Sequence, residues 1–98
     1  MQVTANELAG LPALLFLAQA RSGASRRMAS LVAWVKVNHK RRLNVIDVDV
    51  DSNPDLVSAL GVIELPALVL IKDQRVVARL EGRATGRQID ELIRPYLL

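Results

Sequence analysis

The apolar run Ala13–Ala18, followed within ten residues by a segment of helical periodicity, limits the folds open to this chain. Its near-continuous aliphatic character is typical of a strand that is covered on both faces. After Ser25 the period changes to that of a helix. The apolar stripe of this helix consists of Met28, Leu31, Val32 and Val35. A buried strand that leads into an amphipathic helix predicts a layered α/β domain.

The segment after this helix predicts a second strand and a short second helix. Residues 43–50 are rich in β-branched side chains, which favour strands. Asn53 suits the N-cap of the short helix, Pro54 its first position and Gly61 its end. The buried face of this helix is expected to consist of Leu56, Val57 and Leu60.

The last third of the chain predicts a hairpin and a final helix. Residues 67–71 and 75–80 flank three polar residues, as in an antiparallel hairpin with a short turn. Thr85 suits the cap of a helix that Pro95 should kink or fray in its last turn. The apolar stripe of this helix consists of Ile89, Leu92, Ile93 and Leu97.

The start of the chain predicts a short strand at residues 2–4 and a brief helix capped by Asn6. The resulting element order is β-α-β-α-β-α-β-β-α. Crossover helices require parallel strands, and the closing hairpin adds an antiparallel edge. Because the chain has 98 residues without repeats or linkers, we expect one domain over residues 1–98.

Composition narrows the classes of function. The formal net charge is +3, but the chain has only one Trp, one Tyr and one Phe. A single-strand nucleic-acid binder needs stacking aromatics, so we do not expect nucleic acid as a partner. The longest apolar stretch, residues 11–20, contains Pro12 and is too short to span a bilayer. With no signal-peptide pattern, we expect a cytoplasmic protein without a membrane partner.

The most informative motif is the turn Ser22-Gly23-Ala24-Ser25, here called the serine turn, between the first strand and the first helix. A small-residue turn at a helix N-terminus is where a Cys-x-x-Cys pair would be activated. The chain contains no cysteine. Because the thiolate is the nucleophile of thiol–disulfide exchange, the serines cannot perform that reaction.

Other chemistry at the serine turn is not supported. The only histidine, His39, lies near the far end of the same helix, roughly 20 Å from Ser22, so no Ser-His pair can form. Ser25 is explained more simply as the N-cap of the helix. The acidic series that starts at Asp47 lacks the glycine and the distal glutamate of a calcium loop, so no metal site is expected.

Motifs along nearly the whole chain resemble those of the thioredoxin family. Ser22-Gly23-Ala24-Ser25-Arg26 takes the place of the family's Cys-Gly-Pro-Cys-Lys. Asp51-Ser52-Asn53-Pro54 resembles its Asp-x-Asn-Pro segment, and residues 61–68 resemble its Gly-Ile-x-x-Ile-Pro-Thr-Leu. Lys72-Asp73-Gln74 matches its hairpin turn, and residues 82–85 match its last glycine and helix cap.

The resemblance implies a thioredoxin fold of the α/β class: a central mixed sheet of four to five strands, flanked by helices in a three-layer sandwich. It implies a cis bond between Leu65 and Pro66, beside Ser22, and no cofactor. It leaves the backbone of Leu65 free to pair with an extended substrate peptide. The substrate-binding residues that follow from the resemblance are Arg21, Gly23, Ala24, Leu65 and Pro66.

Several positions depart from the family pattern. Arg21 replaces the tryptophan before the first cysteine, Ala18 replaces another aromatic residue, and Ala24 replaces the motif proline. Phe16 occupies the place of the buried aspartate that assists the second cysteine, while Asp47 occupies the place of its partner lysine. If Asp47 points beneath the second serine, it could transfer the proton that the aspartate normally handles. Alternatively, it is a strand-end carboxylate bonded to solvent or backbone.

Two interpretations of the serines remain. The favoured one is a thiol–disulfide oxidoreductase, a protein disulfide reductase, in a redox-inactive form with serine at both cysteine positions. Its catalytic positions would be Ser22, Ser25 and Asp47, and its partners disulfide-containing proteins and a thioredoxin-reductase-like electron donor. The near-isosteric serines support this interpretation. The alternative, supported by the departures, is a naturally redox-dead module that binds peptides or a partner protein in the same groove.

Overall fold

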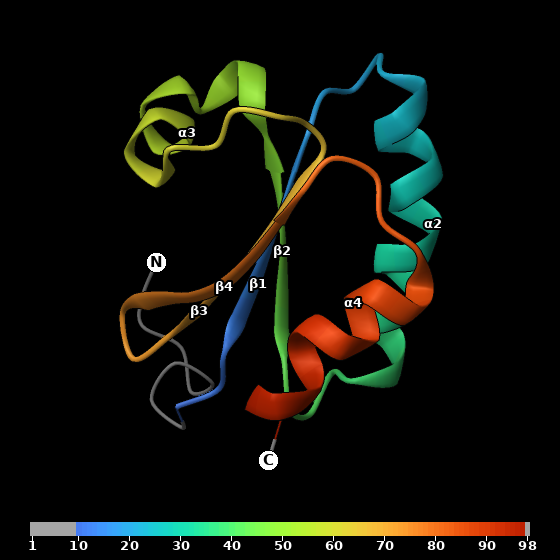
Figure 1. Cartoon of the computed structure of the whole chain (residues 1–98), viewed down its shortest axis with the longest axis vertical. Coiled ribbons are helices and arrows are strands. Elements are labelled where there is room, and N and C mark those ends of the chain that lie inside the picture. Colours follow the sequence, from blue (N-terminus) through green and yellow to red (C-terminus); the bar gives the residue numbers. More distant parts are fainter. Residues whose placement is uncertain (1–9, 98) are drawn as a thin grey trace.

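The computed structural model describes residues 10–97, which form an open four-stranded sheet with helices on both faces (Figure 1). The predicted strand at residues 2–4 and the helix capped by Asn6 lie outside the described residues. The elements are β1 (Ala13–Ala18), α2 (Gly23–Asn38), β2 (Asn44–Asp49), α3 (Pro54–Leu60), β3 (Ala67–Lys72), β4 (Arg75–Glu81) and α4 (Gly86–Ile93). Short 3₁₀ turns follow β2 and α4, at Val50–Ser52 and Arg94–Tyr96.

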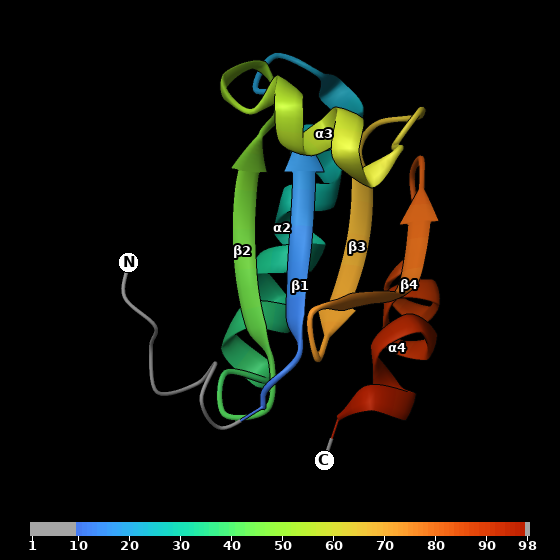
Figure 2. The same cartoon turned by 90° about the vertical axis from the view of Figure 1, so that its left-hand side faces the viewer.

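The strand order is β2-β1-β3-β4, with β1 parallel to β2 and antiparallel to β3, and with β3 antiparallel to β4 (Figure 2). This confirms the predicted mixed sheet and its closing hairpin. The expectation that strands joined by helices are parallel holds for β1 and β2 but is wrong for β3, which follows α3 and runs antiparallel to β1. Ala18 pairs with Asp49, Leu17 with Ala67, and Ala67 with Glu81. Neighbouring strands lie about 4.8 Å apart. The ends of β1, β2 and β4 and the start of β3 therefore lie level at one end of the sheet.

The sheet has helices on both faces, which gives the predicted three layers. Helices α2 and α4 cover one face, and α3 lies on the other (Figures 1 and 2). Successive side chains of a strand point to opposite faces. Leu14 and Phe16 of β1 therefore pack in the cluster under α2 and α4, while Leu15 and Leu17 pack in the cluster on the α3 side.

The apolar stripe predicted for α2 is confirmed by its buried residues. Met28, Val32 and Val35 are buried in the larger cluster, and Leu31 packs partly against it. Leu43, predicted to open the second strand, precedes β2 and is also buried there.

Helix α4 follows the prediction closely. The Thr85 hydroxyl and the Gln88 side chain form a reciprocal capping box at its start. Ile89 and Ile93 are buried, and the chain passes into a 3₁₀ turn that contains Pro95. Proline has no backbone N–H to continue the α-helical bonding, which explains this change.

Helix α3 differs from the prediction in two respects. Leu56, expected on the buried face, is 36% exposed, and only Val57 and Leu60 pack against the smaller cluster. Asn53 stands at the N-cap position, but its amide donates to the carbonyl oxygen of Asp49 and does not cap the helix. A helix of two turns presents only a narrow stripe to the sheet, which two side chains fill.

Candidate functional site

The serine turn forms the N-cap and the first residues of α2, at the end of the sheet where β1 and β2 finish (Figure 1). Ser22 is the N-cap of α2, and its hydroxyl accepts a hydrogen bond from the Ser25 N–H at 3.2 Å. The assignment of the cap to Ser25 was therefore wrong by one helical turn. The helix begins at Gly23 because the Ser22 hydroxyl satisfies a backbone donor that the helix itself leaves free.

Ser25 has a separate structural role in the first turn of α2. Its side chain is buried, at 3% exposure, and its hydroxyl accepts a hydrogen bond from the Gln19 N–H at 3.1 Å. The Ser22 N–H in turn donates to the Gln19 carbonyl oxygen at 3.1 Å. Both serine hydroxyls thus hold the loop between β1 and α2 in shape.

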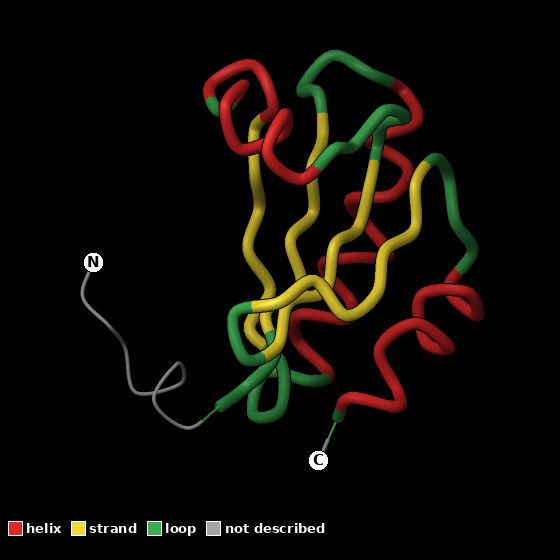
Figure 3. The backbone as a smooth tube through the Cα atoms, turned by 60° about the vertical axis from the view of Figure 1, so that its left-hand side comes forward, coloured by secondary structure: helices red, strands yellow, loops and turns green. Residues whose placement is uncertain are grey.

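The second side of the site is the proline loop, which we define as residues 61–66. The Leu65–Pro66 peptide bond is cis, as expected, and the Pro66 carbonyl oxygen accepts from the Gly82 N–H at 2.8 Å. Within residues 10–97, neither the N–H nor the carbonyl of Leu65 has a hydrogen-bond partner. The proline loop precedes β3, the neighbour of β1, so it shares an end of the sheet with the serine turn (Figure 3).

A glutamate that the sequence analysis did not identify holds the proline loop in place. Glu81 Oε1 accepts hydrogen bonds from the backbone N–H groups of Glu64 at 2.8 Å and Ile63 at 2.9 Å. Its Oε2 lies 3.2 Å from Arg79 Nη2, which also donates to the Leu60 carbonyl oxygen at 2.7 Å. The two backbone donors, aided by the arginine charge, hold the pKa of Glu81 below its usual range.

Arg21 and Ser22 line a cavity of about 400 Å³ together with Asp49 and Asp51. The Asp49 carboxylate accepts hydrogen bonds from the Asp51 N–H at 3.3 Å and the Ser52 hydroxyl at 2.8 Å. The two carboxylates give this side of the serine turn an acidic wall that the sequence analysis did not assign to the site. The signal was present, because Asp49 ends the strand that pairs in parallel with β1.

Asp47 lies on the outer strand β2, opposite Phe16 of β1. Its side chain is 68% exposed, and one carboxylate oxygen lies 3.9 Å from Lys36 Nζ of α2. It makes no hydrogen bond to Ser22 or Ser25 within the described part of the chain. Phe16, which the resemblance places at the position of the family's buried acid, is itself buried, at 5% exposure. The proton-transfer role of Asp47 therefore stays a prediction, and the contact with Lys36 favours a surface carboxylate.

The length of α2 excludes a catalytic pair of Ser22 and His39. Ser22 caps one end of α2 and His39 the other, and a helix of 16 residues is about 24 Å long, so the two side chains cannot form a catalytic pair. Among residues 10–97 there is no group of three side chains suited to hold a metal ion. None of the helices in this range is long and apolar enough to cross a membrane.

The fold and the site together define a thioredoxin-fold domain in which hydroxyls occupy the positions of the two redox thiols. The family model for thioredoxin matches residues 12–95, and the chain belongs to the thioredoxin family.

Relatives of known identity agree with this assignment. The thioredoxin of Listeria monocytogenes is 29% identical over 75 residues, which cover 76% of this chain and 73% of that protein. The thioredoxin of Alicyclobacillus acidocaldarius is 30% identical over 79 residues, covering 81% and 75%. Thioredoxin-2, described as a component of malaria parasite protein secretion machinery, has the same fold, with a TM-score of 0.82 at 20% identity. That match covers 88% of this chain and 84% of the other.

Proposed function

We propose that this chain is a redox-silent thioredoxin-family module that binds extended segments of partner proteins between the serine turn and the proline loop. The observation that carries the proposal is the open backbone of Leu65. Its N–H and carbonyl have no partner within residues 10–97, while the flanking positions are held by Glu81 and Gly82. An extended peptide can pair with such a backbone segment as an added strand.

The composition of the site supports binding without redox chemistry. No thiol is present to attack a disulfide. Phe16 fills the position of the family's buried acid with an apolar ring, so the group that would assist a second thiol is also lost. Both hydroxyls are engaged with backbone N–H groups, which accounts for the serines as structural residues.

The proposal is tested by selecting short peptides from a random library against the whole chain. Amide hydrogen exchange is then measured with and without each selected peptide. We expect slower exchange at Leu65 and no change at Asp73, which lies in the hairpin turn at the opposite end of β3. Failure to select any peptide that protects Leu65 would contradict the proposal.

A second candidate is the disulfide reductase with serine in place of cysteine at positions 22 and 25. The near-isosteric serines, the retained turn and the cis Leu65–Pro66 bond support it. Its partners would be disulfide-containing proteins and a thioredoxin-reductase-like donor, in the cytoplasm.

The double substitution Ser22→Cys and Ser25→Cys tests this candidate, with reduction of a protein disulfide as the assay and dithiothreitol as the reductant. In each turnover the enzyme dithiol is oxidised to a disulfide while the substrate disulfide is reduced to two thiols. Turnover well above that of dithiothreitol alone supports the reductase. An inert dithiol would overturn it and leave the peptide-binding proposal intact.

A further inference from the structure

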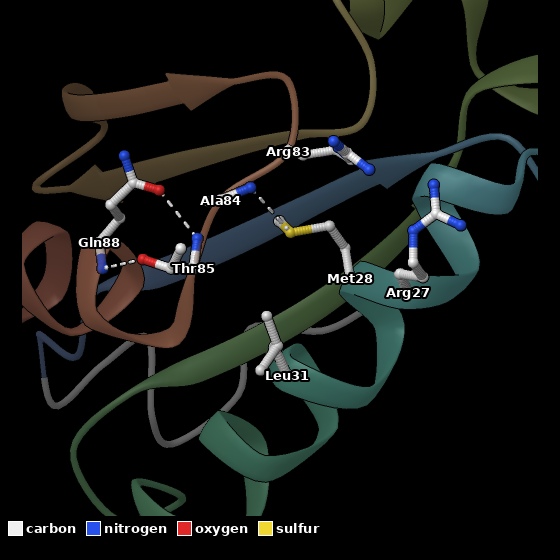
Figure 4. Close-up of a pocket in the computed structure, with 7 residues that line it drawn as sticks. All are labelled: Arg27, Met28, Leu31, Arg83, Ala84, Thr85 and Gln88. Carbon is white, nitrogen blue, oxygen red and sulfur yellow. Dashed lines mark hydrogen bonds between the residues drawn. The ribbon is translucent and has the colours of Figure 1, made fainter.

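A cavity of about 360 Å³ lies between α2 and the segment that leads from β4 into α4 (Figure 4). Arg27 projects beside it from α2 and Arg83 from the loop after β4, while Met28 and Leu31 contribute apolar surface. No carboxylate is among its lining residues. Within residues 10–97, neither arginine takes part in an ion pair. We call this cavity the Arg27–Arg83 pocket.

The other polar residues that line the Arg27–Arg83 pocket, Thr85 and Gln88, leave hydrogen-bond donors available to a ligand. Gln88 Oε1 already accepts from the Thr85 N–H at 2.8 Å, and the Thr85 hydroxyl accepts from the Gln88 N–H at 3.1 Å. The Gln88 amide NH₂ group and the two guanidinium groups can therefore donate to a ligand. A pocket with several donors, two of them cationic, suits a carboxylate, which arginine binds through paired hydrogen bonds.

The pocket borders both segments of the proposed peptide site. Gly82, whose N–H bonds to the Pro66 carbonyl, directly precedes Arg83 in the chain. On the other side, a Cβ placed on Gly23 would lie 3.6 Å from Arg27 Nη1. A peptide advances about 3.3 Å per residue in extended form. A side chain only a few residues from the one that lies against Leu65 can therefore reach the two arginines.

We propose that the Arg27–Arg83 pocket receives the carboxylate of an aspartate or glutamate in the extended segment of the partner protein. This inference rests on the proposed function, because it concerns a peptide bound at the same site. The acidic wall of Asp49 and Asp51 lies beside Ser22 in a different cavity. The acidic residue of the partner therefore lies towards α4, away from β2.

A nucleic-acid phosphate would carry the same charge, but the pocket favours a peptide. Its lining includes no aromatic ring on which a base could stack. Met28 and Leu31 instead offer apolar surface to the methylene groups of an acidic side chain. Such mixed surfaces suit amphipathic side chains.

The test uses the whole chain and peptides selected from the random library, with fluorescence anisotropy to measure Kd. Each aspartate or glutamate of a selected peptide is replaced in turn by asparagine or glutamine. We expect one such replacement to weaken binding about tenfold, as for loss of a charge-assisted hydrogen bond. The double variant Arg27→Gln and Arg83→Gln should weaken the parent peptide similarly and remove its advantage over the amide version.

The matched control is Arg75→Gln with Arg87→Gln, which has the same net charge but changes arginines outside the pocket. It should keep both the affinity and the preference for the carboxylate. If peptides protect Leu65 but bind both double variants equally, the pocket assignment is overturned while the proposed function stands. If no peptide protects Leu65, the proposed function itself fails. A fluorescent single-stranded oligonucleotide provides a further check. If it binds more tightly than the selected peptides, and this binding is lost in the Arg27→Gln and Arg83→Gln variant, the acidic-peptide assignment is also overturned.

Discussion

The backbone N–H of Ser25 donates a hydrogen bond to the hydroxyl of Ser22 at 3.2 Å, so the two serines of the serine turn are joined by the cap of α2. The Ser22 hydroxyl, at a position where a redox enzyme would have a cysteine sulfur, thus caps the start of α2. This relationship makes the stability of the domain sensitive to position 22.

Ser22→Ala should lower the free energy of unfolding by about 1 kcal/mol, because α2 loses its N-cap acceptor. Chemical denaturation measures the change. Ser22→Thr keeps the hydroxyl and serves as the control, with a smaller loss expected. Equal losses in the two variants would show that the cap hydrogen bond does not stabilise the domain.

Glu81→Gln should destabilise the protein at neutral pH, because the proline loop loses the charge that accepts its two N–H groups. The pKa of Glu81 is lowered by folding, so its contribution is present above the pKa of an unfolded glutamate, about 4.3. The contribution is lost as the pH falls through the lower folded pKa. The free energies of unfolding of Glu81→Gln and the unchanged chain, measured by denaturation from pH 7 downwards, should therefore become equal in acid.

Glu91→Gln is the charge-matched control for this experiment. Glu91 lies on α4 and forms an exposed ion pair with Arg87, at 3.9 Å. Exposed pairs of this kind contribute little to stability. If Glu81→Gln lowers the free energy of unfolding by the same amount at all pH values, the role assigned to the Glu81 carboxylate is contradicted.

Gly82→Ala should cost the ~1–2 kcal/mol of a left-handed residue, because Gly82 has φ +84°. The atom nearest to an added Cβ, Glu64 Oε2 at 2.8 Å, is the end of an exposed side chain that can move away. Gly61→Ala isolates the backbone effect, since Gly61 has φ +69° with nothing within 4 Å of the added atom. Gly82→Ala should therefore cost about as much as Gly61→Ala, and adding Glu64→Ala to it should change that cost little. Denaturation of the four proteins checks the prediction, which fails if Gly82→Ala costs much more than Gly61→Ala and Glu64→Ala removes the excess.

Asp47→Asn, introduced into the protein with both cysteines restored, should leave the rate of disulfide reduction unchanged across pH. The exposed Asp47 side chain pairs with Lys36, and within residues 10–97 it makes no hydrogen bond to Ser22 or Ser25. Loss of such a surface pair should change stability by less than about 1 kcal/mol. A slowed second step, with an altered pH profile, would instead assign Asp47 to proton transfer.

The elements of the fold could be predicted because each is specified by neighbouring residues. The apolar run of β1, the stripe of α2 and the capping box of α4 follow from side-chain period and cap chemistry. The position of the site also followed from local signals, since the serine turn follows a strand and starts a helix. The exact cap was misassigned because Ser22 and Ser25 are both suitable cap residues, and only the conformation of the loop from Gln19 selects Ser22.

The surroundings of the site depended on contacts between distant residues. Glu81 reaches Glu64 across 17 positions of sequence, and Ala84 reaches Met28 across 56. The exposure of Asp47 follows from its place on the outer strand of the sheet, which no local pattern reveals.

The sequence alone determined the thioredoxin-like order of strands and helices and the absence of thiols from the serine turn, because local period, caps and composition specify both. The tertiary structure decided which side chains surround that turn. Packing of α2 against the loop after β4 brings Arg27 and Arg83 to one cavity, and the pairing of β3 with β4 brings Glu81 to the proline loop. These arrangements depend on sheet order and helix packing, which bring residues distant in sequence together only in the folded chain.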